Sequence, residues 1–123
     1  MSFKEIQFEL DPLLEKDSIF IMELPLCKLL LMNDANFPWF LLVPRREGIV
    51  EVFDLNDEDR SQLSRESDYL LRKLKEHYQA KKMNVANLGN MVPQLHIHHI
   101  VRYEEDLAWP GPIWGVAKPV PYT

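Results

Sequence analysis

Two histidines and a glutamine occupy alternate positions in the segment QLHIHHIV, residues 94–101. The apolar residues between them predict a strand, in which residues i, i+2 and i+4 share one face. Gln94, His96 and His98 should therefore form one polar row, with neighbouring side chains about 7 Å apart. Such a row on an apolar strand carries a desolvation cost unless it has partners. Two imidazoles that titrate near neutral pH indicate a site for a ligand, a metal ion or a reaction.

The types of these residues suggest three interpretations. A neutral imidazole is a nucleophile that can attack phosphorus or an acyl carbon, while a second imidazole binds phosphate oxygens or exchanges a proton with the leaving group. His-x-His is also a spacing of metal ligands, with a third ligand from elsewhere. The third interpretation is that both histidines are structural. His99 should lie on the opposite face, as a core histidine with a satisfied ring nitrogen.

Several apolar segments predict the strands that position this row. Ile19–Leu24 and Leu26–Met32 read as an antiparallel pair with Pro25 at the turn. The other expected elements are an extended N-terminal entry over residues 1–17 with a helical turn at Pro12–Lys16, a strand at Trp39–Val43, a short extended piece at Ile49–Phe53 and a strand at Asn84–Leu88.

A long helix should begin at Asn56, because an N-cap amide and three acidic residues in the first turn suit the positive end of a helix. Its apolar stripe comprises Leu63, Leu70, Leu71, Leu74 and Tyr78. Strands on both sides of one helix indicate an α+β fold, an antiparallel β-sheet of about five strands covered by one long α-helix. If Leu95, Ile97 and Val101 pack under that helix, the polar row faces away from it, toward a cleft.

The bulk composition limits the function classes. A chain of 123 residues with 46% hydrophobic content predicts a single domain over 1–123, with an irregular Pro- and Trp-rich tail from residue 104. The net charge of -5 argues against a nucleic-acid polymer as partner. Cys27 is the only cysteine, which rules out an internal disulfide and suits a reducing compartment. The charged N-terminus and short apolar runs predict a cytoplasmic protein with no membrane partner. Arg45, Arg46 and Arg102 are interpreted as solvent-facing.

Four segments together resemble the histidine triad (HIT) superfamily. Residues 94–100 resemble its signature H-φ-H-φ-H-φ-φ, where φ is apolar, with Gln94 in place of the first histidine. Gly89–Pro93 resembles the loop that leads into that strand, and Trp39–Arg45 resembles the substrate-side strand. Asp106–Pro112 is similar to the tryptophan-proline tail of the nucleotide-binding branch. The four segments occur in the order of the family, and the resemblance as a whole covers roughly residues 18–115.

The resemblance implies a HIT-like fold and a nucleotide hydrolase or transferase. Such an enzyme attacks the α-phosphate of a nucleoside phosphoramidate or related nucleotidyl substrate. His96 would be the nucleophile that forms a transient nucleotidyl-histidine, and His98 would bind the phosphate and help to protonate the leaving group. Gln94 would orient the site by hydrogen bonds without titrating. The alternatives are a slow or non-catalytic nucleotide-binding module and a metal-dependent hydrolase that uses the His-x-His pair.

The resemblance also implies a nucleotide-binding set. Asn33 falls near the ribose-binding position, and Asn84 or Asn87 near the phosphate-binding asparagine. Backbone N–H groups around Asn90 and Met91 could cradle the phosphate. Trp109 is the candidate to reach the partner's site in a homodimer. The expected ligand is a purine nucleotide or nucleotide conjugate, and no cofactor or metal is expected.

Three positions depart from the family pattern. Gln94 keeps hydrogen bonds but not a charge. Met91 stands where many members carry a hydroxyl that assists the leaving group, and Trp39 stands near a position where another site histidine is often found. These departures put the leaving-group preference and the rate in question. Trp114 is interpreted as an anchor of the tail.

Overall fold

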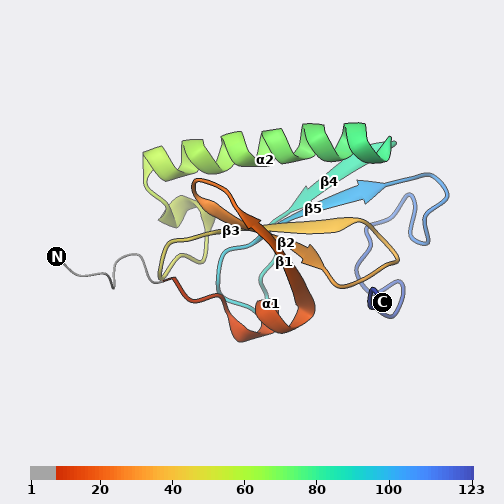
Figure 1. Ribbon diagram of the computed structural model, residues 1–123, viewed down its shortest axis with the longest axis horizontal. Coiled ribbons are helices and arrows are strands. Elements are labelled where there is room, and N and C mark those ends of the chain that lie inside the picture. The colour runs from red at the N-terminus through yellow and green to blue at the C-terminus, as the bar shows by residue number, and fades with distance from the viewer. Residues whose placement is uncertain (1–7) are drawn as a thin grey trace.

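The computed structural model describes residues 8–123, so residues 1–7 of the expected N-terminal entry lie outside the described chain. A five-stranded antiparallel sheet with the strand order β1-β2-β3-β5-β4 forms the centre of the fold (Figure 1). The elements are α1 (Pro12–Asp17), β1 (Ser18–Glu23), β2 (Cys27–Met32), β3 (Trp39–Pro44), the 3-10 helix η2 (Val52–Asp54), α2 (Asp57–Tyr78), β4 (Lys82–Ala86) and β5 (Ile97–Arg102). The predicted α+β class is confirmed.

The long helix α2 covers one face of the sheet, and the short helix α1 lies on the other face (Figure 1). Asn56 caps α2 as predicted, because its side-chain oxygen accepts from the Asp59 N–H at 2.8 Å. Beneath α2, residues from the helix, β2, β3, β5 and the segment just before β5 form one buried core, which includes Cys27, Leu29, Leu42, Leu63, Leu70, Leu74, Leu95, Ile97 and Val101. The predicted packing of the histidine segment under the helix is therefore confirmed.

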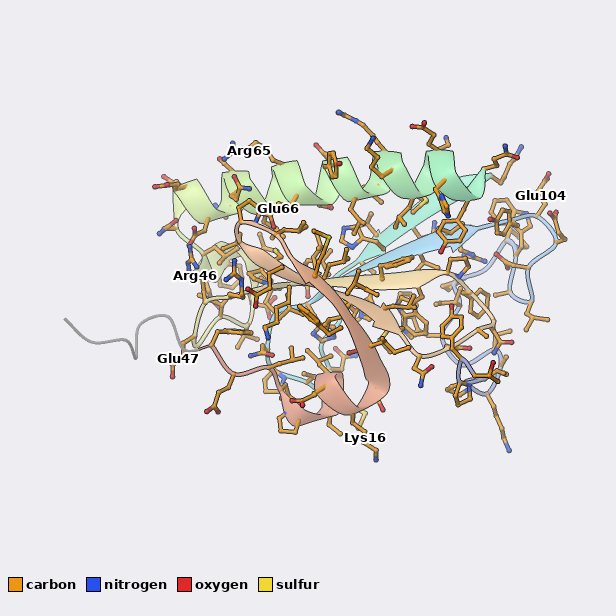
Figure 2. The ribbon with its side chains drawn as sticks, viewed as in Figure 1. Lys16, Arg46, Glu47, Arg65, Glu66 and Glu104 are labelled. Carbon is orange, nitrogen blue, oxygen red and sulfur yellow. The ribbon has the colours of Figure 1, made fainter. Side chains whose placement is uncertain are left out.

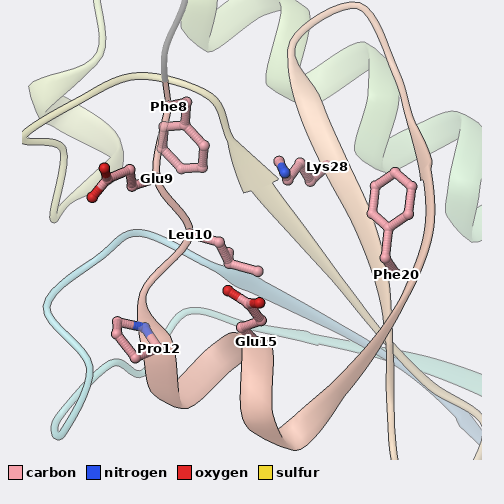
Figure 3. Close-up of a pocket in the computed structure, with 7 residues that line it drawn as sticks. All are labelled: Phe8, Glu9, Leu10, Pro12, Glu15, Phe20 and Lys28. Carbon is pink, nitrogen blue, oxygen red and sulfur yellow. The ribbon is translucent and has the colours of Figure 1, made fainter.

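The opposite face carries a smaller core around α1. Leu14 packs there against Leu30, Leu41 and Val43, the residues of β2 and β3 that alternate with those under α2. The chain before α1 leaves a hollow of about 510 Å³ at the rim of this layer (Figure 3). It is lined by Phe8, Glu9, Leu10, Pro12, Glu15, Phe20 and Lys28, and it contains no histidine. This face of the sheet is the one that the two alternate histidines reach.

Three predicted elements differ from the structure by more than one residue at a boundary. The histidine strand begins at Ile97 rather than Gln94, and the Leu95 N–H donates to Ile49 O instead of a neighbouring strand. The extended piece predicted over 49–53 is partly the 3-10 helix η2, because the Asp54 carboxylate accepts from the Glu51 N–H. The strand before the histidines ends at Ala86, and a loop with a positive φ of 76° at Gly89 follows.

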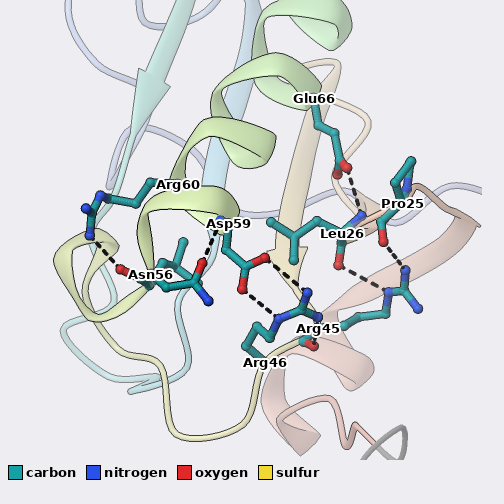
Figure 4. A network of polar contacts seen from close by, with 9 residues as sticks. Pro25, Leu26, Arg45, Arg46, Asn56, Asp59, Arg60 and Glu66 are labelled. Carbon is teal, nitrogen blue, oxygen red and sulfur yellow. Dashed lines mark hydrogen bonds and ion pairs between the residues drawn. The ribbon is translucent and has the colours of Figure 1, made fainter.

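Charged side chains join the start of α2 to the sheet. Glu66 lies on the sheet side of α2 and Arg65 on the opposite side (Figure 2). The Glu66 carboxylate accepts from the Leu26 and Cys27 N–H groups, and Arg46 donates to Asp59 at 2.7 Å (Figure 4). Arg45 donates to three backbone carbonyls, those of Leu24, Pro25 and Leu26. Arg45 is half-buried, so its interpretation as solvated is wrong, whereas Arg46 is exposed as predicted and also pairs with Asp59.

Within residues 8–123, none of the helices has the length and apolar character needed to cross a membrane.

Candidate functional site

His96 and His98 form the centre of a small pocket on the α1 side of the sheet. His96 directly precedes β5 and His98 lies within it, and their ring centroids are 5.1 Å apart. The pocket has a volume of about 280 Å³. Its lining is mostly apolar and comes from α1, the ends of β2 and β3, the loop before β5 and the tail: Leu13, Leu14, Asp17, Met32, Trp39, Leu41, Met91, Val92, His96, His98 and Trp114.

The hydrogen bonds of His96 fix its tautomer. Nδ1 lies 2.7 Å from Gln94 O, and a carbonyl oxygen can only accept, so Nδ1 carries the proton. In the neutral ring, Nε2 then holds a free lone pair. The loop before the strand closes tightly here, because a Cβ on Gly89 would lie 3.1 Å from Val92 O and 3.8 Å from the His96 ring. The hydrogen bond to Gln94 O thus leaves Nε2 as the acceptor nitrogen of the neutral His96 ring.

His98 has the opposite tautomer. The Trp39 indole N–H donates to its Nδ1 at 2.9 Å, so the proton of the neutral ring sits on Nε2. Trp114 contacts the same imidazole edge-on, with ring centroids 5.2 Å apart. Burial lowers the pKa of His98 to about 4, and repulsion by His96 and His99 acts in the same direction. At neutral pH His98 is therefore an uncharged N–H donor beside His96.

His99 points to the other face, as predicted, and both of its ring nitrogens are satisfied. Nδ1 donates to Ile97 O at 3.0 Å, and Nε2 lies 2.7 Å from the Ser67 hydroxyl of α2. Burial lowers the pKa of His99 to about 4, although the hydrogen bond to Ile97 opposes the shift. This histidine joins the helix to the sheet and does not reach the pocket.

Gln94 does not continue the polar row, because it lies at a bend before the strand. Its side chain binds the N-terminal segment instead: Oε1 accepts from the Asp11 N–H at 2.8 Å, and Nε2 donates to Glu9 O at 2.9 Å. Asp11 is the N-cap of α1, so the amide holds the helix whose residues Leu13 and Leu14 form one wall of the pocket. The sequence indicated the helical turn, but no local pattern connects it to the histidines.

Asn33 lies beside the pocket rather than in it. It lines an adjoining hollow of about 290 Å³, which shares Asp17, Met32 and Trp39 with the histidine pocket. Its side-chain oxygen accepts from the Tyr122 N–H at 2.8 Å. Because neighbouring groups also bind the C-terminal tail, the tail forms a wall of this second hollow.

Four of the five other predicted binding residues belong to β4 or to the loop between β4 and β5. Met91 is 85% exposed at the mouth of the histidine pocket, and Asn90, which is also exposed, precedes it in the loop. Asn84 accepts a hydrogen bond from Arg102, and Asn87 lines a separate hollow beneath α2. The structure therefore brings neither Asn84 nor Asn87 to the pocket.

Trp109 lies against Arg102 instead of the histidines, with the guanidinium carbon 5.6 Å from its ring centre. Arg102 is 1% exposed and donates to Asp106, Asn84 and Gly111 O, so its interpretation as a solvent-facing end is wrong. Burial alone raises the pKa of Asp106, but hydrogen bonds from Arg102 and three backbone N–H groups lower it to about 2. Trp114, which the sequence indicated only as an anchor of the tail, is the tryptophan of the tail that reaches His98.

A protein metal centre needs at least three converging ligands in most cases. Residues 8–123 contain no group of three or more His, Cys, Asp or Glu side chains placed to hold one ion. The His-x-His pair therefore has no third ligand of these types in the described chain.

Comparisons with known proteins agree on one family. A model of the HIT domain matches residues 14–105. A histidine triad protein from Bradyrhizobium japonicum is 47% identical with a TM-score of 0.93, covering 94% of this chain and 87% of that one. One from Marinobacter aquaeolei VT8 is 52% identical with a TM-score of 0.93, covering 94% and 85%. One from Sinorhizobium meliloti 1021 is 45% identical with a TM-score of 0.94, covering 97% and 88%. A search among curated proteins found no match.

Proposed function

The chain belongs to the HIT family, a family of nucleotide-binding proteins and hydrolases, and from this premise we propose that it hydrolyses nucleotide conjugates at the α-phosphate. One observation supports the proposal above all others. His96 and His98 lie side by side in one pocket with opposite tautomers, so that one ring offers a lone pair and the other an N–H. That pairing suits attack on a phosphoryl group and stabilisation of its oxygens.

The proposed first step is attack of His96 Nε2 on the α-phosphorus. A P–N bond forms, the bond to the leaving group breaks, and the leaving group departs with the bonding electrons. The nucleotidyl-histidine bears a positive charge on its ring, and the Nδ1–H bond to Gln94 O stabilises that charge. Water then attacks the phosphorus, which releases the nucleotide and a proton and restores His96. His98 Nε2–H hydrogen-bonds a phosphate oxygen throughout.

The lining of the two adjoining hollows supports a nucleotide as ligand. The histidine pocket offers an apolar wall from α1 and two tryptophans, which suits a planar purine and excludes water. Asn33 in the adjoining hollow supplies an amide for a ribose hydroxyl. Backbone N–H groups near Asn90 and Met91 are proposed to bind phosphate oxygens at the mouth. The geometry gives Asn84, Asn87 and Trp109 no direct contact with such a ligand in this protomer.

The proposed substrates are nucleoside phosphoramidates and related nucleotidyl esters and anhydrides. The deciding experiment is mass spectrometry of protein quenched in acid-free denaturant during turnover of an adenosine nucleotidyl substrate. We expect an adenylyl adduct on the peptide that contains His96, which disappears in His96→Ala. Ser67→Ala is the matched control, because it removes a hydrogen bond to His99 on the opposite face of the sheet and leaves the lining of the histidine pocket unchanged.

The non-catalytic alternative predicts a different result. Met91 offers no hydroxyl at the pocket mouth, which favours slow departure of the leaving group. Under that alternative, calorimetry shows tight binding of AMP while no adduct and no product form. The homodimer implied by the family stays a prediction, which sedimentation equilibrium of the full chain tests.

A further inference from the structure

Trp39 reaches His98 from the adjacent strand. It is the first residue of β3 and pairs with Ile100 of β5, whereas Leu41 pairs with His98. Trp39 and Leu41 share a face, so the indole lies diagonally opposite His98, within reach of a long side chain. The resulting Nε1–Nδ1 distance is 2.9 Å. The centroids of the two rings are 5.7 Å apart and the ring planes are inclined at 42°, so the rings meet at their edges and do not stack face to face.

The chemistry of this contact is one-sided. An indole nitrogen donates and never accepts, and it does not titrate in water. Nδ1 of His98 must therefore stay unprotonated for as long as the bond persists. His96 has the opposite partner, a carbonyl that only accepts. The two histidines differ because of the groups behind them and not because of their own residue type.

This contact restricts what His98 can do in the proposed reaction. Full transfer of the Nε2 proton to a leaving group leaves an imidazolate, unless Nδ1 takes up a replacement proton. The Trp39 N–H occupies that position and blocks the replacement. His98 can thus share its proton in a hydrogen bond but cannot give it away. A leaving group must depart as a stable anion or obtain its proton from water.

We propose that Trp39 is a positioning residue that fixes His98 as a neutral Nε2–H donor and thereby sets the leaving-group specificity of the enzyme. The favoured substrates are nucleotidyl anhydrides and aryl esters, whose leaving groups are carboxylate, phosphate or phenolate. Phosphoramidates of alkyl amines are disfavoured, because their nitrogen needs a proton before the P–N bond breaks. The leaving-group specificity rests on the proposed function, whereas the tautomer of His98 is a property of the free protein.

The surroundings of His98 support the assignment. Its charged form is disfavoured by burial and by the neighbours His96 and His99. Among residues 8–123, Asp17 of α1 is the only carboxylate lining the pocket, and none of the residues that β2, β3 or the tail contribute to the lining is charged. No lining residue from those elements therefore carries a charge that would oppose the effect of the indole on the protonation of His98.

The first test is nitrogen-15 NMR of the free protein. In the wild type we expect a single Nε2–H tautomer of His98, together with a coupling between Trp39 Nε1 and His98 Nδ1 across the hydrogen bond. An Nδ1–H tautomer in the wild type overturns the inference. This measurement needs no variant and no substrate, so it tests the tautomer of His98 even if the protein proves to be a binding module.

The second test compares two tryptophan variants. Trp39→Phe removes the N–H and keeps an aromatic ring, while Trp114→Phe alters the other ring against His98 and leaves the hydrogen bond in place. We expect His98 in Trp39→Phe to titrate at higher pH and to populate both tautomers, and His98 in Trp114→Phe to resemble the wild type. Unchanged NMR behaviour in a folded Trp39→Phe contradicts the inference.

The same variants are then assayed with adenosine 5′-phosphate conjugates whose leaving groups span a range of pKa values. The ratio of kcat/KM for an alkyl phosphoramidate to that for an aryl ester should rise at least about tenfold in Trp39→Phe, since a working general acid contributes 10²–10⁴-fold. The ratio in Trp114→Phe should stay unchanged. An equal fall for both substrates in Trp39→Phe indicates a merely structural role. Absence of turnover and of a His96 adduct in the wild type contradicts the proposed function instead.

Discussion

Histidines lie on both faces of the segment that contains β5, but their surroundings differ between the two faces. His96 and His98 on the α1 side are 5% and 6% exposed, and His99 on the α2 side is fully buried. His99 has a partner on each ring nitrogen, whereas within residues 8–123 the hydrogen bonds of His96 and His98 reach only Nδ1. A buried histidine with both nitrogens bonded is structural, and one with a nitrogen free toward a pocket is available for chemistry. Burial alone does not separate the two classes.

The largest expected effect comes from the pocket face. His96→Ala should reduce turnover by roughly 10⁴-fold or more, because loss of a nucleophile removes the covalent route. Its unfolding free energy should change little, since the His96 side chain makes a single hydrogen bond to the part of the chain that the structure describes. Steady-state kinetics and urea unfolding measure both quantities. Turnover that survives in this variant contradicts the proposed mechanism.

The helix face should give the reverse pattern. His99→Ala creates a cavity and leaves the Ser67 hydroxyl without its partner, so the unfolding free energy should fall by about 2–4 kcal/mol. The folded fraction should keep kcat within a few-fold of the wild type. Urea unfolding and kinetics below the transition test this. A large loss of kcat in the folded variant would contradict the purely structural role of His99.

Acidification should weaken the fold through both faces. The pKa values of His98 and His99 are lowered from 6.5 to about 4 in the folded chain, so the unfolded chain binds more protons between these values. The unfolding free energy should therefore be constant above pH 6.5 as far as these groups are concerned, and should fall as the pH drops from 6.5 to 4. Urea unfolding at a series of pH values should show a smaller slope in His99→Ala. An identical slope in the variant contradicts the assignment of His99.

The smallest expected effect comes from the other half of the helix contact. Ser67→Ala should cost about 1 kcal/mol, the usual net value of one hydrogen bond. In a double-mutant cycle, the losses from Ser67→Ala and His99→Ala should be less than additive, because both remove the same bond. Additive losses in urea unfolding would show that the contact contributes nothing to stability.

Most of the fold was predictable because its signals are local. Alternation along β5 assigned His99 to one face and His98 to the other, and Asn56 with the acids that follow it marked the start of α2. The boundaries near the site were less accurate. Gln94 fits an extended strand by its neighbours, but its amide instead bonds to Glu9 and Asp11, 85 and 83 residues away. No periodic pattern carries information over that separation.

The sequence by itself determined the family, the sheet beneath one helix, and the pair of histidines that shares a face, because those features follow from residue periodicity and from a motif within one segment. Only the tertiary structure decided what stands behind each imidazole: Gln94 O behind His96, the Trp39 indole behind His98 and the Ser67 hydroxyl behind His99. The tertiary structure also places Asn84 and Trp109 against Arg102, and it places Trp114 in the pocket against His98. The physical reason is that the roles of a ring nitrogen depend on a hydrogen-bond partner about 3 Å away, and that partner can come from any part of the chain.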